Sequence, residues 1–468
     1  MRKESLVRPD IVSPAAWADA GNLARAELVE LARRLGLDSS NSSKPPSSDG
    51  PGSDGKSGAG ASGTQNRKRG GQPGHSKHER PLIPTKDCDE VHVIRPDCCE
   101  HCGESLADVT ADDHPRRHQI VDLPPIKPIV VEYQLQRLQC RCCGHTTRGK
   151  LPSGVPPGRF GPRVISLATI LGGMCRLSHR LTATIFTNVF HLPLSTGVIS
   201  KLRARGRKSL DGAWREIVEK VRSSRRMHAD ETRWSQSGEK AWLWTATCEK
   251  ATLFFIRNSR SGDVARELIG DSSRVVVTDR YSGYAWLDES SHQYCWSHLL
   301  RDFQAMISVG GAAGEIGSRL KQAGQLVIHH WKRWKNNDIQ WSTFLHLARA
   351  CRREIESALM DGLTCGISKF EGICQQLMRH HLCLWTFLRE KGLQPTNNPG
   401  ERALRTGVIW RKLSFGTNSS EGSRYVETIL SVLESCRQND INPFNFIHDS
   451  VVASLHPGKK PPRLFADS

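Results

Sequence analysis

The sequence places acidic residues where a metal-assisted phosphodiester-cleaving site would need them. Asp230 lies in the strand-like stretch RMHADETRW, and Asp279 ends the β-branched stretch VVVTD. The carboxyl end of such a strand opens onto the crevice in which α/β sheets bind ligands. Cutting a phosphodiester without a covalent enzyme intermediate requires an aligned water or hydroxyl and neutralised charge on the attacking and leaving oxygens. Two Mg²⁺ ions do both, and Mg²⁺ prefers converging carboxylate oxygens.

Each candidate acid also has a purely structural interpretation. An Asp at the end of a strand is often only a turn residue. The run from Asn398 to Glu401 scans as N-cap, N1, N2 and N3 of a helix, so Glu401 is suited to close a capping box. Arg405, four residues further on, is a second candidate partner of Glu401. Spacing alone therefore does not select three ligands among 48 acidic residues.

Two cysteine pairs share one layout, in which Cys-x-x-Cys is followed by Gly. The pairs are Cys99 with Cys102 and Cys140 with Cys143. The spacing lets both thiolates of a pair reach one ion, and the Gly permits the tight turn of a zinc knuckle. Two such pairs complete a tetrahedral Cys₄ site, so the sequence predicts one structural Zn²⁺. A catalytic zinc is not expected, because four thiolates leave no open position.

The register of this zinc site has alternatives. Adjacent spare ligands are Cys98, His101, Cys142 and His145. Chance clustering of buried cysteines is the structural alternative. Zinc would supply about 10–16 kcal/mol of folding free energy. That contribution matters in a region with few large apolar residues.

Composition narrows the class of protein. The 66 Lys and Arg residues exceed the 48 Asp and Glu residues, and the net charge of +18 favours a polyanionic partner over an ordinary basic protein. No run of 18 apolar residues occurs, so no membrane span is expected. The N-terminus lacks the apolar region of a secretory signal. We expect a cytoplasmic, DNA-associated protein, whose 15 cysteines are thiols or metal ligands rather than disulfides.

The elements that position these residues fall into six predicted segments. They are an N-terminal helix (1–37), a disordered basic linker (38–84), a zinc-binding domain (85–150), a helical region (151–222), an α/β region (223–450) and a tail (451–468). The linker is rich in Ser, Gly, Pro and basic residues, with almost nothing to bury. Within the α/β region, three strands, a helix and a fourth strand precede a helical insertion over about 292–392, and a last helix follows.

The segment 151–222 predicts a helix-turn-helix. A helix over about 178–189 is followed by the turn HLPLS, and Ser195 is suited to cap a basic third helix. This order is typical of DNA-binding units, although helical hairpins that bind no DNA are common. Basic residues on a helix often face only solvent. The candidate DNA contacts, here and near Glu401, are Lys201, Arg203, Arg205, Arg402, Arg405, Arg411 and Lys412.

Several long motifs occur in the order found in transposases of the insertion sequence 66 (IS66) family. They are NSSKPPSSD (41–49), the two CxxCG units, HADET (228–232), VVVTDRYSGY (275–284), CWSHLLRDF (295–303), NNPGERALR (397–405) and RKLSF (411–415). The chain resembles this family from about residue 30 to 450. The resemblance implies a multidomain α/β fold with a ribonuclease H-like catalytic core. It also implies an acid triad, carried here by Asp230, Asp279 and Glu401, that holds two Mg²⁺ or Mn²⁺ ions.

The resemblance implies a DDE transposase that cleaves DNA at transposon ends and transfers the strands into target DNA. The implied partners are double-stranded DNA, further copies of the chain in a synaptic complex, and companion proteins of the same element. One alternative is a catalytically inactive zinc-containing DNA-binding protein derived from a transposase. Another is a serine or tyrosine recombinase, which is disfavoured because only five Tyr occur and none lies in a convincing Arg/His cluster.

Two local features accompany the resemblance. Cys295 and His298 match a Cys-x-x-His signature that follows the second acid in several groups of DDE transposases. We favour a buried packing motif over a two-ligand zinc site. Gly400 stands where the family usually has Ala. That difference weakens the helix by somewhat less than about 1 kcal/mol without removing a ligand.

Overall fold

The computed structural model describes residues 81–110, 115–152, 155, 158–270, 274–456 and 458–465. The predicted N-terminal helix, most of the predicted linker and the last three residues of the tail lie outside them. The described residues divide into two compact units between Pro128 and Ile129. This division falls inside the segment predicted as one zinc-binding domain, and each unit is described by itself.

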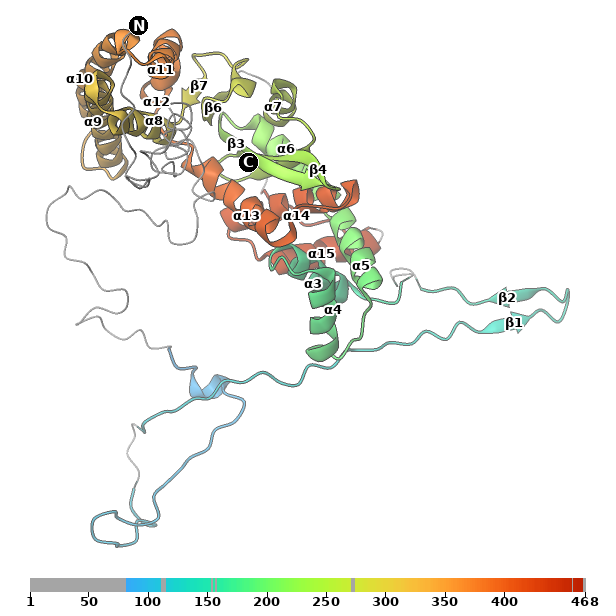
Figure 1. The fold of residues 1–468 in the computed structure, drawn as a ribbon. Helices are drawn as coiled ribbons and strands as arrows, with labels where there is room; N and C mark the ends of the chain where they lie inside the picture. Colours follow the sequence, from blue (N-terminus) through green and yellow to red (C-terminus); the bar gives the residue numbers. More distant parts are fainter. Residues whose placement is uncertain are drawn as a thin grey trace, which may run out of the picture. The chain divides into compact units, whose positions relative to one another are not determined.

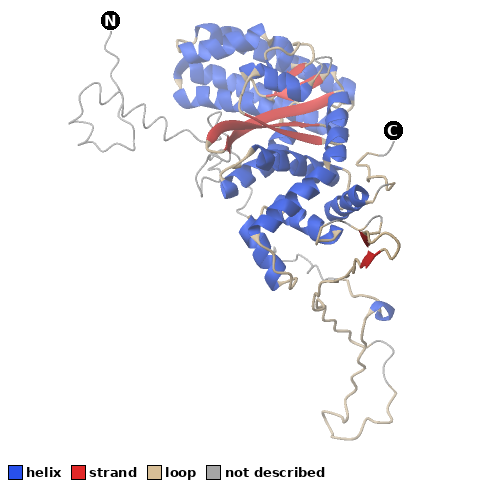
Figure 2. Ribbon diagram, turned by 90° about the vertical axis from the view of Figure 1, so that its right-hand side faces the viewer, coloured by secondary structure: helices blue, strands red, loops and turns tan. Residues whose placement is uncertain are grey.

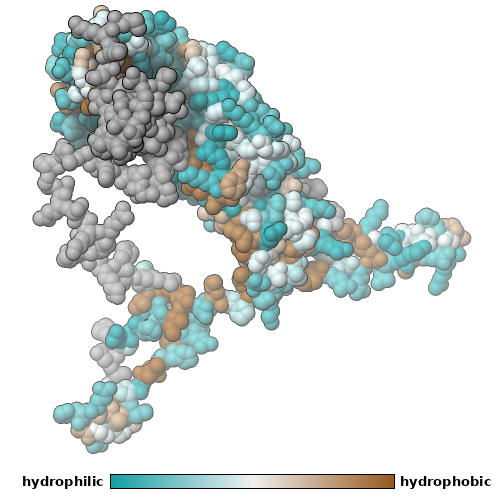
Figure 3. All heavy atoms as spheres, in the orientation of Figure 1, coloured by the Kyte–Doolittle hydropathy of each residue, from teal (hydrophilic) through white to brown (hydrophobic). Residues whose placement is uncertain are grey.

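The unit that ends at Pro128 has little regular structure in its described residues. It contains the 3-10 turn η2 (Thr85–Asp87) and a β-bridge between Cys98 and Ser105. None of its described residues is buried, and Figure 3 shows hydrophobic atoms on its surface. A segment without a hydrophobic core needs another source of folding free energy, such as a bound metal.

The second unit begins with a small hairpin and a set of helices (Figure 1). The antiparallel hairpin is β1 (Arg137–Gln139) and β2 (Thr146–Arg148). The helices are α3 (Pro162–Gly173), α4 (His179–Asn188), α5 (Thr196–Ser209) and α6 (Asp211–Ser223). The predicted cap of the third helix is confirmed, because the Ser195 hydroxyl accepts from the backbone N–H of Val198 at 3.3 Å.

A five-stranded sheet with helices on both sides follows (Figure 2). Its strands are β3 (Arg226–Gln236), β4 (Glu239–Thr247), β5 (Thr252–Arg257), β6 (Val275–Thr278) and β7 (His292–Tyr294), with α7 (Gly262–Ile269) between β5 and β6. The spatial order is β5-β4-β3-β6-β7. The strand β4 is antiparallel to both of its neighbours, β3 and β5, whereas β6 and β7 run parallel to β3.

The three predicted strands, the helix and the fourth strand are confirmed, whereas β7 was missed. His292–Tyr294 was expected to belong to the helical insertion, yet it pairs in parallel with β6. Three residues are too few to show an alternating pattern, and the strand is defined by its pairing with a distant segment.

The helices of the insertion and of the C-terminal part complete the fold. The insertion contains α8 (Trp296–Val309), α9 (Gly311–Lys335), α10 (Trp341–Asp361), α11 (Ser368–Arg379) and α12 (Thr386–Arg389). The C-terminal helices are α13 (Asn398–Ser414), α14 (Ser420–Gln438) and α15 (Pro443–Leu455). Within the described ranges, no helix combines the length and apolar character that crossing a bilayer requires.

Two hydrophobic cores hold this unit together. One joins α3–α6, most of the sheet and α13–α15. The other belongs to the insertion, with Val277 of β6 and Tyr294 of β7 as its links to the sheet. The predicted boundary at residue 222 therefore does not separate two cores, because the helical region packs directly on the sheet and the C-terminal helices.

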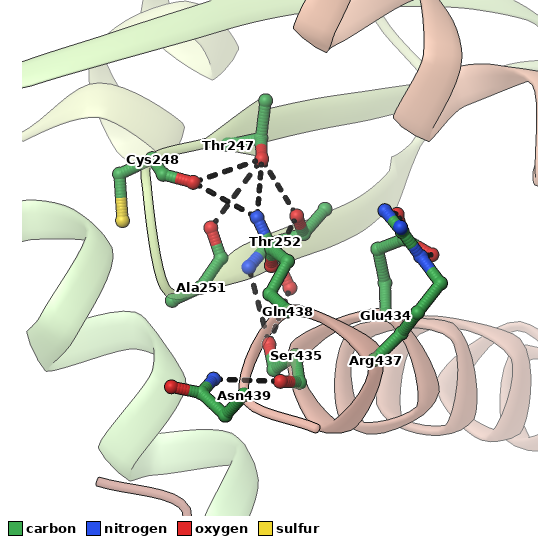
Figure 4. A network of polar contacts seen from close by, with 9 residues as sticks. All are labelled: Thr247, Cys248, Ala251, Thr252, Glu434, Ser435, Arg437, Gln438 and Asn439. Carbon is green, nitrogen blue, oxygen red and sulfur yellow. Dashed lines mark hydrogen bonds and ion pairs between the residues drawn. The ribbon is translucent and has the colours of Figure 1, made fainter. Parts of the chain in front are cut away.

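The edge strand β5 is covered by side chains of α14. The backbone N–H groups of Thr252 and Phe254 donate to the hydroxyls of Ser435 and Ser431 at 3.1 and 3.0 Å. The N–H of Ile256 donates to a carboxylate oxygen of the same helix at 2.6 Å. Figure 4 shows one end of this contact. Side chains four residues apart on the helix match alternate residues of the strand, and an exposed sheet edge is removed.

Candidate active site

The three predicted acids lie in one cavity of about 590 Å³. Asp230 comes from β3, Asp279 directly follows β6, and Glu401 is in the first turn of α13. The other acidic and basic residues of the wall are Glu231, Arg233, Arg260, Arg301, Arg405 and Arg411, and His298 also lines it. The cavity thus combines four carboxylates with five arginines.

The pairing of β3 with β6 brings the two aspartates together. His228 pairs with Val277 in the parallel register. Asp230 and Asp279 each lie two residues further along, so both emerge at the same end of adjacent strands. The backbone N–H of Glu231 donates to Asp230 Oδ1 and that of Tyr281 to Asp279 Oδ1, both at 2.9 Å. These bonds orient the two carboxylates.

The helix that carries Glu401 is fixed against β3 by Asn397. The N-cap of α13 is Asn397 rather than Asn398, and its side chain makes no capping hydrogen bond, so the alternative of a capping box that starts at Asn398 is not supported. The Asn397 Nδ2 atom instead donates to the carbonyl of Ala229 at 2.9 Å. Gly400 leaves room for this, because a Cβ there would lie 2.8 Å from Asn397 Oδ1.

The Cys-x-x-His motif lies against the same helix start. The buried thiol of Cys295 accepts from the backbone N–H of Asn397 at 3.0 Å. The Nδ1 atom of His298 lies 3.6 Å from Glu401 Oε1. Cys295, His298 and Glu401 place their ligand atoms within 4.8 Å of one another, which no other set of three possible ligands does in the described part of the chain. Cys295 of the motif therefore packs against the start of α13, and His298 lies beside Glu401 in the cavity.

The acids repel one another in a confined site. Burial, followed by the charges of Glu231, Asp279 and Glu401, raises the pKa of Asp230 well above its usual range. Burial also raises the pKa of Asp279, although a backbone N–H and nearby arginines oppose it. Burial raises the pKa of Glu401 against the opposing effect of Arg301. Because Glu401 Oε1 is buried without a hydrogen-bond partner, this cluster is suited to bind cations.

Sequence reasoning missed several residues of the wall. Glu231 directly follows Asp230 on β3 and is buried, and its carboxylate belongs to the cavity. It pairs with Arg260 and accepts from the hydroxyl of Tyr284. The only available signal was its place in HADET, beside Asp230. Arg260 and Tyr284 reach it through tertiary contacts that no local pattern predicts.

The candidate DNA contacts separate into distinct environments. Arg405 and Arg411 line the cavity. Lys201, Arg402 and Lys412 are exposed on helices, and Arg205 is half-buried. Arg203 was predicted to contact DNA but is buried.

The hydrogen bonds of the Arg203 guanidinium explain why the predicted DNA contact of this residue is wrong. It donates to the carbonyls of Ala168 and Leu177 at 3.3 and 2.9 Å and to the hydroxyl of Thr182 at 2.7 Å. The residue shares the inward face of α5 with Ile199 and Leu202. Arg203 therefore ties three helices together rather than facing a ligand.

The two cysteine turns, each within its own unit, have the same backbone geometry. The N–H of Gly103 donates to the carbonyl of Cys99, and that of Gly144 to the carbonyl of Cys140, both at 2.9 Å. Both glycines have positive φ, at 77° and 71°, as expected for a zinc knuckle. Backbone N–H groups of the following residues lower the pKa of the Cys99 and Cys140 thiols.

Comparison with known families identifies the chain. The profile of the Transposase IS66 family matches residues 177–425, which include Asp230, Asp279 and Glu401. The chain belongs to the IS66 family of transposases. The profile of the zinc-finger binding domain of IS66 transposases matches residues 96–144, which contain all four predicted zinc ligands. A family of unknown function (DUF6444) matches residues 15–81. IS66 membership supports a transposase role in a mobile element and a structural zinc.

Two relatives come from Sinorhizobium fredii (strain NBRC 101917 / NGR234). Uncharacterized protein y4qI is 25% identical over 271 residues, which cover 50% of this chain and 49% of the relative. Uncharacterized protein y4hP is 22% identical over 403 residues, which cover 77% of this chain and 71% of the relative. The IS66 chain thus spans about half of the first relative and most of the second.

Proposed function

We propose that this IS66 chain cleaves DNA strands at transposon ends and transfers them into target DNA, using divalent ions held by Asp230, Asp279 and Glu401. The observation that carries the proposal is the convergence of these acids, from three distant segments, in one cavity. Burial, followed by the charges of the neighbouring acids, raises the pKa of Asp230, and bound cations would offset both effects.

A ribonuclease H-like core is part of this proposal. It is supported by the order β5-β4-β3-β6-β7, with three antiparallel strands followed by two parallel ones. It is also supported by the positions of the acids, on the central strand, after the neighbouring parallel strand and on a later helix. The helices α8–α12 are then an insertion between the second and third acids.

The donor chemistry of the cavity fits two Mg²⁺ or Mn²⁺ ions. All three acids offer oxygen, and Glu401 Oε1 is buried without a hydrogen-bond partner. The three acids are not a group whose ligand atoms all lie within 4.8 Å of one another. With metal–oxygen distances of about 2.1 Å and ions about 4 Å apart, ligands of different ions can be roughly 8 Å apart. A spread of ligand atoms beyond 4.8 Å is therefore compatible with a pair of ions.

The residues of the chain would bind, orient and neutralise the DNA. When bound, the two ions would activate the attacking water or 3′-hydroxyl and stabilise the leaving oxygen. Arg301, Arg405 and Arg411 lie in the same wall and are suited to hold phosphates near the acids. Further along the DNA, Lys201 on α5 and the zinc-binding segment would contact the duplex. A homo-oligomer would bring two ends together, with companion proteins of the element as further partners.

The direct test uses the purified chain, Mg²⁺ or Mn²⁺, and labelled duplexes taken from both flanks of its coding sequence. The wild type should nick a flank at a defined phosphodiester. Asp279→Asn should reduce single-turnover cleavage by at least about a thousandfold while binding the flank DNA normally. The matched control is Asp361→Asn on α10, whose carboxylate pairs with Arg319. Its cleavage should stay at the wild-type level.

Other outcomes separate the alternatives. Normal cleavage by Asp279→Asn would remove this residue from the mechanism. Flank binding without cleavage by the wild type in either ion would favour the inactive DNA-binding protein. A covalent protein–DNA adduct formed in EDTA would favour a serine or tyrosine recombinase.

A further inference from the structure

The wall of the cavity contains an arginine that the metal ligands do not explain. Arg260 follows β5 and lines the cavity together with Asp230 and Asp279. Its Nε and Nη2 atoms both donate to Glu231 Oε1, at 2.9 and 2.6 Å. Its Nη1 atom forms no hydrogen bond within the described ranges. One edge of the guanidinium is thus held by the protein, and another remains available to a ligand.

Glu231 serves this arginine rather than a metal ion. Its side chain is 1% exposed. Arg260 occupies Oε1, and the hydroxyl of the buried Tyr284 donates to Oε2 at 2.5 Å. Protein donors therefore bind both carboxylate oxygens. This distinguishes Glu231 from Glu401, whose Oε1 atom has no hydrogen-bond partner.

Aromatic rings fix the plane of the guanidinium. The Arg260 Cζ atom lies 3.7 Å from the ring centre of Tyr281 and 4.8 Å from that of Trp242. The Tyr281 hydroxyl donates to the Arg260 carbonyl, which ties the loop to the ring. A guanidinium stacked on aromatic rings and bonded to a carboxylate has lost most of its rotamer freedom. Little further entropy is lost when it binds a ligand.

The residues that hold Arg260 also hold the two aspartates. Glu231 binds Arg260 through its carboxylate and Asp230 through its backbone N–H. Tyr281 stacks on Arg260 and binds Asp279 through its backbone N–H. The guanidinium is therefore positioned by the same two residues that orient both acids. An ion pair that only neutralised Glu231 would not require this shared positioning.

We propose that Arg260 binds a non-bridging oxygen of the DNA phosphate at the bond that is cleaved, and that Glu231 and Tyr281 are its positioning residues. This inference rests on the proposed function, because it assigns the phosphate of that same site. A planar guanidinium with remaining N–H donors is suited to a tetrahedral phosphate beside the acids. In the reaction, Arg260 would bind the phosphate without exchanging protons or bonds.

The first experiment compares cleavage of the flank duplexes by Arg260→Gln, Arg260→Lys and wild type. Both variants should cleave at least about tenfold more slowly in single turnover. Lysine keeps the charge but loses the planar stack and the paired hydrogen bonds. The matched control is Arg266→Gln, since Arg266 also pairs with a carboxylate (Asp263, 2.9 Å) and lies over a ring (Trp286, 5.2 Å). It does not line the cavity and should cleave normally.

The second experiment tests the contact itself. Once the cleaved bond of the wild type is mapped, that phosphate is replaced by an uncharged methylphosphonate, and binding is measured in EDTA. The wild type and Arg266→Gln should bind the replaced duplex about tenfold more weakly than the unmodified one. Arg260→Gln should show less than about a threefold difference, because the partner of the phosphate is already absent. A merely structural arginine would leave the full difference in place.

The outcomes separate this inference from the proposed function. Absence of cleavage by the wild type contradicts the proposed function itself. If the wild type cleaves and Arg260→Lys cleaves normally, the role of Arg260 is overturned and the proposed function stands. The same holds if Arg260→Gln shows the full methylphosphonate effect. Thermal unfolding shows whether Arg260→Gln folds. If it does not, Arg260→Lys replaces it in both experiments. Cleavage should again be at least about tenfold slower, and the methylphosphonate effect should again be below about threefold.

Discussion

The side-chain amide of Asn397 donates to the backbone carbonyl of Ala229 at 2.9 Å, across 168 positions of sequence. The bond joins the start of the helix that carries Glu401 to the strand that carries Asp230. Asn397→Ala should therefore reduce single-turnover cleavage by more than about tenfold, because Glu401 loses its fixed distance from the aspartates. It should also weaken Mn²⁺ binding, measured by titration calorimetry.

The control for this prediction distinguishes a misplaced Glu401 from a general loss of protein stability. Asn439 also bridges backbone carbonyls, those of Lys250 and Ser435, both at 2.7 Å, but at the far end of α14. Asn397→Ala should lower the free energy of unfolding by about 1–3 kcal/mol, and Asn439→Ala, whose bonds are exposed or partly buried, by about 0.5–1.5 kcal/mol. Only Asn397→Ala should lose activity per folded molecule. Equal activities of the two variants would contradict the positioning role.

Metal analysis of the purified chain tests the zinc site. The wild type should contain about one zinc per chain, and the double variant Cys99→Ser/Cys102→Ser should contain none. Cys98→Ser should retain the metal, because the tight turn and the lowered pKa belong to the Cys99 thiol. Zinc loss in Cys98→Ser and retention in Cys102→Ser would show that the ligand register is shifted by one residue.

The contact between α14 and β5 should stabilise the fold. Ser431→Ala leaves the buried N–H of Phe254 without an acceptor, so the free energy of unfolding should fall by about 1–3 kcal/mol. The matched control is Ser450→Ala, another buried serine, whose hydroxyl only donates back to the carbonyl of Phe446 in its own helix. Ser450→Ala should change the free energy of unfolding by well under about 1 kcal/mol, because only the difference in helix propensity between Ser and Ala contributes. Chemical denaturation measures both, and equal costs would contradict the account.

His292 should make the fold sensitive to acid. It is buried and bonded to Thr278 Oγ1 at 2.7 Å. Burial, and to a smaller extent the charge of His380, lowers its pKa from 6.5 to about 3. The unfolded chain therefore binds the proton more readily. The contribution to stability is complete above pH 6.5 and is lost as the pH falls toward 3.

Between pH 7 and pH 5 this residue should remove about 2 kcal/mol of unfolding free energy. His292→Gln keeps a hydrogen-bonding group without the titration. The change in stability between the two pH values should shrink by that amount, whatever the variant costs at pH 7. His346→Gln, at an exposed histidine of α10, should leave the change as in the wild type. An unchanged pH dependence in His292→Gln would refute the assignment.

DNA binding by α5 should depend on its exposed lysines. Lys201 and Lys208 are exposed one above the other on this helix. The double variant Lys201→Gln/Lys208→Gln should weaken flank binding and reduce the slope of log affinity against log salt by about 2, since each neutralised phosphate contributes about 0.9. Lys250→Gln/Lys391→Gln, also exposed, should retain the slope. An equal slope in both double variants would exclude α5 as a phosphate-binding helix.

The sequence alone determined the local parts of this protein. A strand-like stretch and a β-branched stretch predicted the strands around Asp230 and Asp279, and the cap at Ser195 predicted where α5 begins. The spacing of Cys99 and Cys102 predicted the turn that Gly103 completes. These features depend on backbone preferences and on neighbours within a few residues, so they are visible in a single sequence.

Only the tertiary structure decided which side chains meet. The strand β7 exists because β6 lies beside it, and Arg203 is buried because α3 and α4 surround it. The partners of Glu231 and the bond from Asn397 to Ala229 likewise join distant segments. Which distant groups become neighbours is set by packing of the whole core and by satisfaction of buried polar atoms. That information is distributed over the whole chain, and no local spacing contains it.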